Sequence, residues 1–127
     1  MGILGSKETT QGDFISKTIA KNCVVLFIKD SCPFSQDALE IFNKLKIPFC
    51  SVSLNQMEDM DKMQQKLGDM TGARTVPRVF INGKSIGGAD ETLELAQSGK
   101  LLEMVKECAP ELLKSACKPD FGVKKRN

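Results

Sequence analysis

Histidine, tryptophan and tyrosine are all absent from this chain of 127 residues. Without histidine, the chain has no Ser–His or Cys–His catalytic couple and lacks the commonest zinc ligand. The acid–base and nucleophilic chemistry that remains is that of cysteine, lysine and carboxylate side chains. Any catalytic site must therefore draw on these residue types.

Long apolar runs are also missing. No stretch approaches the roughly 18 apolar residues that span a bilayer, and no apolar segment follows the amino terminus. We therefore expect neither a transmembrane helix nor a secretory signal. The net charge of +2 is uneven, because residues 118–127 hold four basic residues against one acid and the rest of the chain carries −1. A near-neutral body with a basic tail does not favour a nucleic-acid partner.

The five cysteines occupy positions 23, 32, 50, 108 and 117, and no two of them form a CxxC pair. This spacing supports neither a zinc ribbon nor a disulfide framework. Without a secretory signal, a reducing compartment is expected, with most thiols free. Cys23 and Cys50 fall in apolar runs and are predicted to be buried. One of Cys108 and Cys117 could be exposed and form an incidental or regulatory disulfide.

Hydrophobic periodicity predicts a single α/β domain at 10–110, after a tail at 1–9 and before a C-terminal extension with a basic end at 111–127. The order of the elements predicts a four-stranded mixed sheet flanked by helices on both faces. A methionine stripe at 57–70 is interpreted as core packing, and Asp90 as a helix N-cap. Strands are expected at 23–28, 49–54, 76–81 and 84–86, and helices at 10–22, 33–46, 57–70, 90–97 and 100–108.

Cys32 lies between an apolar strand and a helix that begins with Pro33, a residue suited to the first helical turn. Unpaired N–H groups and the macrodipole favour an anion at a helix N-terminus. The pKa of Cys32 should therefore fall below the roughly 8.5 of a free thiol, and Lys29 adds a cation nearby. An accessible thiolate of low pKa is what thiol–disulfide exchange requires. The alternative is a cysteine that merely lies in a strand-to-helix loop.

Three segments resemble the signatures of the glutaredoxin family, in the family's order and spacing: residues 29–35 (KDSCPFS), 71–81 (TGARTVPRVFI) and 86–91 (IGGADE). The resemblance covers residues 10–110. It implies a thioredoxin-like fold in which Pro77 is cis. It also implies a glutathione-dependent thiol–disulfide oxidoreductase with Cys32 as the nucleophile.

The resemblance further implies glutathione as co-substrate. Lys29, Gln64 and Arg74 would hold its glycine carboxylate, and Phe34, in place of the commoner tyrosine, would form an apolar wall. The backbone of 75–77 would pair with its cysteine like an added strand, and the start of the helix near Asp90 would hold its γ-glutamyl end. Simpler alternatives are a surface charge for Arg74, a solvated amide for Gln64 and only a cap for Asp90. The remaining implied contacts are Thr75, Val76, Pro77, Gly88 and Ala89.

Ser35 stands where dithiol members carry the resolving cysteine, so the chain is functionally monothiol. The serine is either native or a replacement of that cysteine. The implied reaction is the deglutathionylation of proteins or small disulfides by a monomer, recycled through an NADPH-dependent glutathione reductase. The alternative function is a carrier or sensor with a [2Fe–2S] cluster held between two subunits by Cys32 and glutathione. Pro33 weighs against the carrier, and no other metal site is expected.

The amino terminus matches the pattern for N-myristoylation of Gly2. One acyl chain binds membranes only marginally, so a second signal would be needed. The basic segment 124–126 could supply it, or could be only a solubilising end. The sequence thus predicts a cytoplasmic protein that meets a membrane surface only if Gly2 is acylated.

Overall fold

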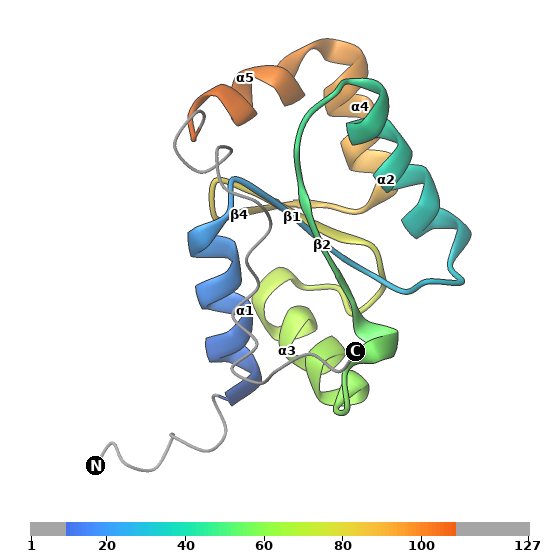
Figure 1. Ribbon diagram of the computed structural model, residues 1–127, viewed down its shortest axis with the longest axis vertical. Helices are drawn as coiled ribbons and strands as arrows, with labels where there is room; N and C mark the ends of the chain where they lie inside the picture. The colour runs from blue at the N-terminus through green and yellow to red at the C-terminus, as the bar shows by residue number, and fades with distance from the viewer. Residues whose placement is uncertain (1–9, 109–127) are drawn as a thin grey trace.

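A four-stranded mixed sheet forms the centre of the structure, a computed structural model that describes residues 10–108. The strand order is β2-β1-β3-β4. The central strand β1 (Val24–Ile28) is parallel to β2 (Cys50–Ser53) and antiparallel to β3 (Arg78–Ile81). Strand β4 (Lys84–Gly87) closes the hairpin with β3 at the other edge (Figure 1).

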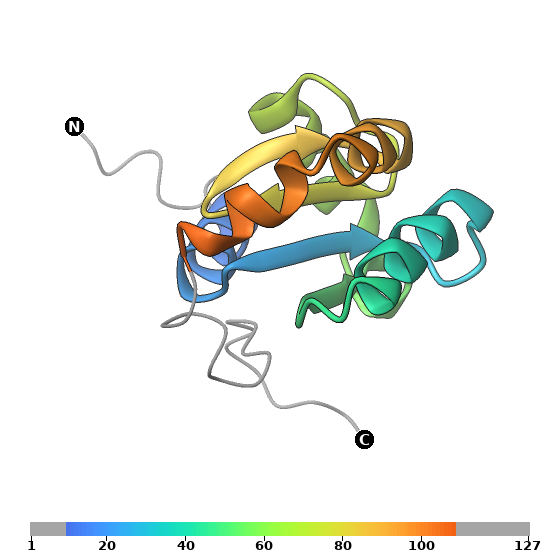
Figure 2. The same ribbon diagram turned by 90° about the horizontal axis from the view of Figure 1, so that it is seen from above.

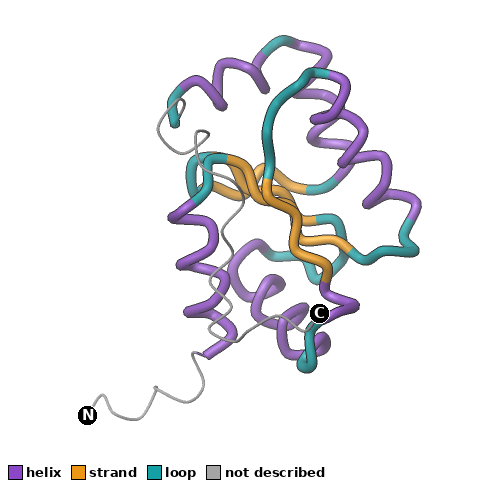
Figure 3. Tube along the Cα trace, in the orientation of Figure 1, coloured by secondary structure: helices purple, strands orange, loops and turns teal. Residues whose placement is uncertain are grey.

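Helices cover both faces of this sheet. On one face lie α1 (Thr10–Lys21) and α3 (Met60–Thr71), and on the other lie α2 (Pro33–Lys44), α4 (Ala89–Ser98) and α5 (Lys100–Lys106). The two layers are clear in Figure 3, and Figure 2 shows α2, α4 and α5 from above the sheet. This is the predicted thioredoxin-like architecture. None of the helices between residues 10 and 108 is long and apolar enough to cross a membrane.

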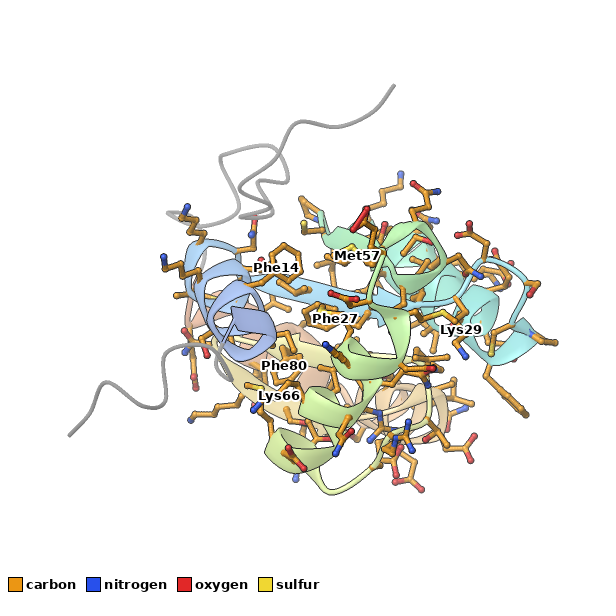
Figure 4. The ribbon with its side chains drawn as sticks, turned by 90° about the horizontal axis from the view of Figure 1, so that it is seen from below. Phe14, Phe27, Lys29, Met57, Lys66 and Phe80 are labelled. Atoms are coloured by element: carbon orange, nitrogen blue, oxygen red, sulfur yellow. A yellow bond between two sulfur atoms is a disulfide. The ribbon has the colours of Figure 1, made fainter. Side chains whose placement is uncertain are left out.

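Strand β1 separates the two halves of the core. Leu26 belongs to a buried cluster that includes Phe42 of α2 and Leu101 of α5. Phe27 faces the opposite side, where its ring meets Phe80 edge-on at 5.7 Å between centroids; Figure 4 shows both rings against α1 and α3. Burial on both faces explains why the run is continuously apolar instead of alternating.

The boundaries differ from the predicted ones at two places that shape the site. Residues 54–56, predicted to include the end of a strand and a linker, form a 3-10 turn, η2 (Leu54–Gln56). Strand β3 begins at Arg78, two residues later than expected. The Val76–Pro77 peptide bond is cis, as the resemblance implies. Proline has no N–H to donate to the hydrogen bonds of a β-sheet, so β3 begins after Pro77.

Cys23 and Cys108 form a disulfide, with 5.5 Å between their Cα atoms. The expectation that most thiols are free is therefore wrong, since among the described cysteines Cys32 has the free thiol. The pairing spans 85 positions, and only the topology places the start of β1 beside the end of α5. Cys23 and Cys50 are buried, as predicted. Cys108 is also buried, and Cys117 lies outside the described residues.

Removal of this disulfide should destabilise the domain. For a loop this long, the free energy of unfolding should fall by about 2–4 kcal/mol in Cys108→Ala, because the unfolded chain regains the entropy of an open loop. Guanidinium unfolding of the variant, compared with wild type with and without a phosphine reductant, measures the change. Reduced wild type should move toward the variant. Equal midpoints in all three samples would contradict a stabilising role.

Candidate active site around Cys32

Cys32 is the N-cap residue of α2, and Pro33 occupies the first turn as predicted. The Cys32 carbonyl accepts hydrogen bonds from the N–H groups of Ser35 (3.1 Å) and Gln36 (3.2 Å). Its own N–H donates to the carbonyl of Lys29 at 3.1 Å. These bonds fix a half-buried, free thiol at the start of a helix, where the first-turn N–H groups have no intrahelical partner.

The surroundings of Cys32 favour its thiolate. Burial alone raises the pKa of the Cys32 thiol, but hydrogen bonding with Ser35 and with the N–H of Phe34, together with the positive charge of Lys29, outweighs this effect. The pKa of Cys32 therefore lies below the ordinary thiol value, in the predicted direction. Figure 4 shows Lys29 at the end of β1, where the chain turns toward α2.

Alkylation should reveal this shift. Since only the thiolate reacts, the rate at Cys32 should rise with pH to a plateau, and its midpoint should lie below the roughly 8.5 of a free thiol. Iodoacetamide labelling, followed at Cys32 by peptide mass spectrometry, gives the midpoint. The same peptide labelled in denaturant is the control. Equal midpoints in the folded and denatured protein would show that the folded surroundings do not lower the pKa of Cys32.

Ser35 occupies the position of a resolving cysteine and is fully buried in the first turn of α2. Its Oγ accepts the backbone N–H of Lys29 at 3.2 Å. The serine thus connects the chain before Cys32 with the helix after it. No second thiol of the described residues is free to attack from this position.

Asp30 anchors the turn that precedes Cys32. Its N–H donates to Oδ1 of Asn55 at 2.6 Å, and its Oδ1 accepts the Ser53 hydroxyl at 2.8 Å. The Gln36 amide donates to the Asp30 carbonyl at 3.1 Å. The sequence alone did not indicate these contacts, because they depend on where η2 meets the end of β1.

The cis-proline loop lies beside the thiol. The Cys32 Sγ is 3.9 Å from the carbonyl oxygen of Val76, to which the thiol donates. An added Cβ on Gly88 would lie 3.2 Å from the carbonyl oxygen of Pro77, so the segment before α4 packs against the same loop. The structure thus brings Cys32, Val76, Pro77 and Gly88 into one neighbourhood.

Arg74 follows α3, and the chain there folds back along the helix to meet Gln64. The Gln64 amide donates to the Arg74 carbonyl at 3.0 Å. The stem of Arg74 crosses the helix at Gly68, where an added Cβ would lie 2.6 Å from its Cγ. Gln64 therefore braces the backbone that carries the exposed Arg74, a role that the sequence did not indicate.

The start of α4 differs from the prediction. Gly88, not Asp90, is the N-cap, and its N–H donates to Oε1 of Glu91 at 2.8 Å. That bond, the N–H of Glu91 itself and Arg78 together lower the pKa of the Glu91 carboxyl despite slight burial. Asp90 lies in the first turn and is exposed. The Gly-x-x-Glu sequence at 88–91, in which Glu91 is the third residue of α4, was the signal for this capping arrangement.

The remaining residues that were predicted to contact glutathione are Phe34, Thr75 and Ala89. The Phe34 side chain is 60% exposed, so it is accessible to a bound molecule. Thr75 is exposed and Ala89 is half-buried at the first position of α4. Gly2, the candidate lipidation site, lies outside the described residues. Among residues 10–108, no cluster of three or more acidic, cysteine or histidine side chains could hold a metal ion.

Comparison with known proteins identifies the family. The glutaredoxin family model matches residues 24–86. The mitochondrial glutaredoxin-2 of Mus musculus is 43% identical over 104 residues, which cover 82% of this chain and 67% of that protein. Glutaredoxin-C4 of Arabidopsis thaliana is 38% identical over 104 residues, 81% of this chain and 76% of that protein.

Solved structures agree in fold. A buckwheat glutaredoxin–glutathione complex matches with a TM-score of 0.77 at 35% identity, over 79% of this chain and 91% of that chain. Oxidized glutaredoxin 2 from Chlamydomonas reinhardtii matches with a TM-score of 0.70 at 37% identity, over 76% of this chain and 94% of that chain.

The cytoplasmic localisation expected from the sequence is wrong. The similar glutaredoxin-2 proteins of mouse, rat and Bos taurus are mitochondrial. This chain spans 66–67% of their length, and the cytoplasmic expectation rested only on the absence of a secretory signal.

Matching sequence, fold and a thiol at a helix N-terminus together place the chain in the glutaredoxin family of thiol–disulfide oxidoreductases.

Proposed function

We propose that the protein removes glutathione from mixed disulfides by a monothiol mechanism, as a monomer. The observation that supports this most directly is Ser35 at the resolving position, one turn from Cys32 and buried against it. A hydroxyl there cannot form a disulfide with Cys32. The thiolate must therefore pass its glutathione to an external thiol. Glutathione-coupled reduction of a glutathionylated peptide, with NADPH and glutathione reductase, tests the proposal.

The proposed cycle has two exchange steps. In the first, the Cys32 thiolate attacks the glutathione sulfur of the mixed disulfide, and the target leaves as a thiolate that takes a proton from solvent. Cys32 then carries glutathione in a disulfide. In the second, a glutathione thiolate attacks the sulfur of that bound glutathione, the Cys32 thiolate leaves, and oxidised glutathione forms. Each step exchanges one S–S bond for another, and the reductase supplies the two electrons per turnover.

The cis-proline loop is proposed to align the cysteine of glutathione. An extended peptide can add to exposed backbone through main-chain hydrogen bonds. The Val76 carbonyl lies 3.9 Å from the Cys32 sulfur, so a cysteine paired with Val76 would present its sulfur to the thiolate. Thr75 and Pro77 flank this contact. The matched buckwheat protein contains glutathione, which supports the same ligand here.

The ends of glutathione are proposed to bind on two sides of this loop. The glycine carboxylate meets Arg74, with Gln64 and Lys29 as further donors, because charged donors form the stronger bonds to a carboxylate.

The γ-glutamyl carboxylate meets the N–H groups of Ala89 and Asp90 at the start of α4, because first-turn N–H groups favour an anion and the Gly88 N–H already donates to Glu91. Asp90 then pairs with the γ-glutamyl ammonium. The exposed Phe34 ring supplies an apolar surface at the open side of the thiol.

Arg74→Ala should weaken glutathione binding. Loss of a charged hydrogen bond costs about 1–3 kcal/mol, so the KM for glutathione should rise roughly 5- to 150-fold. Steady-state kinetics with varied glutathione measure the change. Lys84→Ala, which removes an exposed cation on β4, is the matched control and should keep the wild-type KM. An unchanged KM in Arg74→Ala would show that Arg74 does not bind glutathione.

The carrier alternative would use the same thiol, with Cys32 of two copies and two glutathiones around a [2Fe–2S] cluster. The described part of each chain offers one free thiol, so the cluster would require a dimer. Pro33, fixed in the first turn of α2 beside Cys32, favours the redox role. Anaerobic purification distinguishes the two functions: a colourless monomer supports the proposed enzyme, and a brown dimer contradicts it.

A further inference from the structure

Gly68 stands inside a helix, where glycine is an unfavourable residue. It lies in α3, one turn before the helix ends at Thr71. Glycine in a helix is less stable than alanine, because it loses more backbone freedom on folding. Its φ is not positive, in contrast to that of Gly72 at the end of the same helix, so the backbone does not require glycine. The reason for glycine at position 68 therefore lies in its packing.

The space beside Gly68 is filled by the stem of Arg74. An added Cβ at position 68 would lie 2.6 Å from Cγ of Arg74 and 3.6 Å from both its Cα and its Cδ. Carbon atoms in contact are about 3.5–4.0 Å apart. The Cγ of Arg74 thus occupies the space that a Cβ at position 68 would need. The Arg74 side chain crosses α3 at the one position of that helix whose residue has no Cβ.

Hydrogen bonds hold the backbone of Arg74 against α3. The Gln64 amide donates to the Arg74 carbonyl at 3.0 Å, and the N–H of Ala73 donates to the Thr71 hydroxyl at 3.2 Å. Gln64 and Gly68 are four residues apart and therefore share one face of the helix. Because the backbone is held, a Cβ at position 68 would rotate the Arg74 side chain about χ1 to another staggered position. That rotation would carry the guanidinium away from its present place.

We propose that Gly68 is a positioning residue for glutathione, which acts by setting the direction of the Arg74 side chain. The inference rests on the proposed function, in which Arg74 and Gln64 bind the glycine carboxylate. The Gln64 amide has two N–H donors, and the Arg74 carbonyl uses one of them. The second can point to the same carboxylate as the guanidinium. Gly68 leaves the room that the Arg74 stem needs to bring the two groups to one ligand.

Gly68→Ala and Gly68→Ser test this role, because both add a Cβ where the Arg74 stem lies. The KM for glutathione should rise roughly 3- to 10-fold in each, since the charged hydrogen bond is weakened without being lost. The kcat and the alkylation midpoint of Cys32 should stay at their wild-type values, as expected when uniform binding is removed. Gln65→Ala, at an exposed position of α3, is the matched control and should keep the wild-type KM.

The double variant Gly68→Ala/Arg74→Ala shows whether Gly68 acts through Arg74. Its KM should equal that of Arg74→Ala alone, because no stem is left to displace. Thermal unfolding, which needs no glutathione, should show the same coupling. Alanine is the better helix former, so Gly68→Ala should raise the unfolding midpoint more in the Arg74→Ala background than in wild type.

Three results would contradict this role. A wild-type KM in folded Gly68→Ala, beside a raised KM in Arg74→Ala, would overturn the inference and leave the proposed function intact. A KM in the double variant well above that of Arg74→Ala would also overturn it, because Gly68 would then act in another way. A wild-type KM in Arg74→Ala would contradict the proposed binding of the glycine carboxylate, and the positioning role with it.

Discussion

The Cys32→Ser variant is expected to lose glutathione-coupled reduction by about 10³-fold or more, down to the background exchange between glutathione and the substrate. A serine hydroxyl does not ionise near neutral pH and cannot form a disulfide. The helix N–H groups and Lys29 that favour a thiolate would surround a neutral oxygen. No other described cysteine has a free thiol to replace it.

The fold should survive this substitution, because serine is close to cysteine in shape and is a good N-cap residue. Circular dichroism and thermal unfolding check the fold. Cys108→Ala provides the matched cysteine variant: Cys23 and Cys32 flank opposite ends of β1, so activity should persist there while stability falls. Substantial turnover in Cys32→Ser would mean that another group performs the exchange.

Ser35→Cys is expected to open a dithiol route, in which a second thiol can form a disulfide with Cys32. Residues three apart on a helix have Cβ atoms about 5–6 Å apart, and disulfides bridge pairs at such spacings. The new thiol, buried in place of the Ser35 hydroxyl, would attack the disulfide between Cys32 and glutathione. Direct reduction of protein disulfides should rise. Deglutathionylation should persist or fall, since an internal disulfide diverts the glutathionylated intermediate.

Peptide mapping of oxidised Ser35→Cys, without reductant, measures the outcome. A peptide in which Cys32 is linked to the new cysteine is the expected product. Ser31→Cys is the matched control, because its thiol would lie on the exposed turn before α2. If oxidised Ser35→Cys contains no such linkage, the placement of Ser35 beside the Cys32 sulfur is wrong.

Local patterns were sufficient to predict the sheet and the position of the nucleophile. The apolar run at 23–28 indicated a strand buried on both faces, and β1 separates the two core clusters. Pro33 marked the start of α2, so the helix N-terminus at Cys32 could be derived from the sequence. Both features depend on residues that are close together in the chain, so a single sequence is enough to predict them.

Contacts between distant segments could not be derived in this way. Cys23 and Cys108 meet only because the topology brings the start of β1 to the end of α5. The hydrogen bond from the Asp30 N–H to Asn55 likewise depends on the 3-10 turn after β2. At α4 a local signal existed and was misinterpreted, since Asp90 resembles an N-cap although Gly88 holds that position.

The mass of the intact protein after exposure to a glutathionylated peptide shows whether Cys32 works by a monothiol cycle. We expect a single added glutathionyl group, mapped to Cys32, which free glutathione then removes without any internal disulfide involving Cys32. No adduct, an adduct at a different cysteine, or an internal disulfide of Cys32 would contradict a monothiol cycle through this residue.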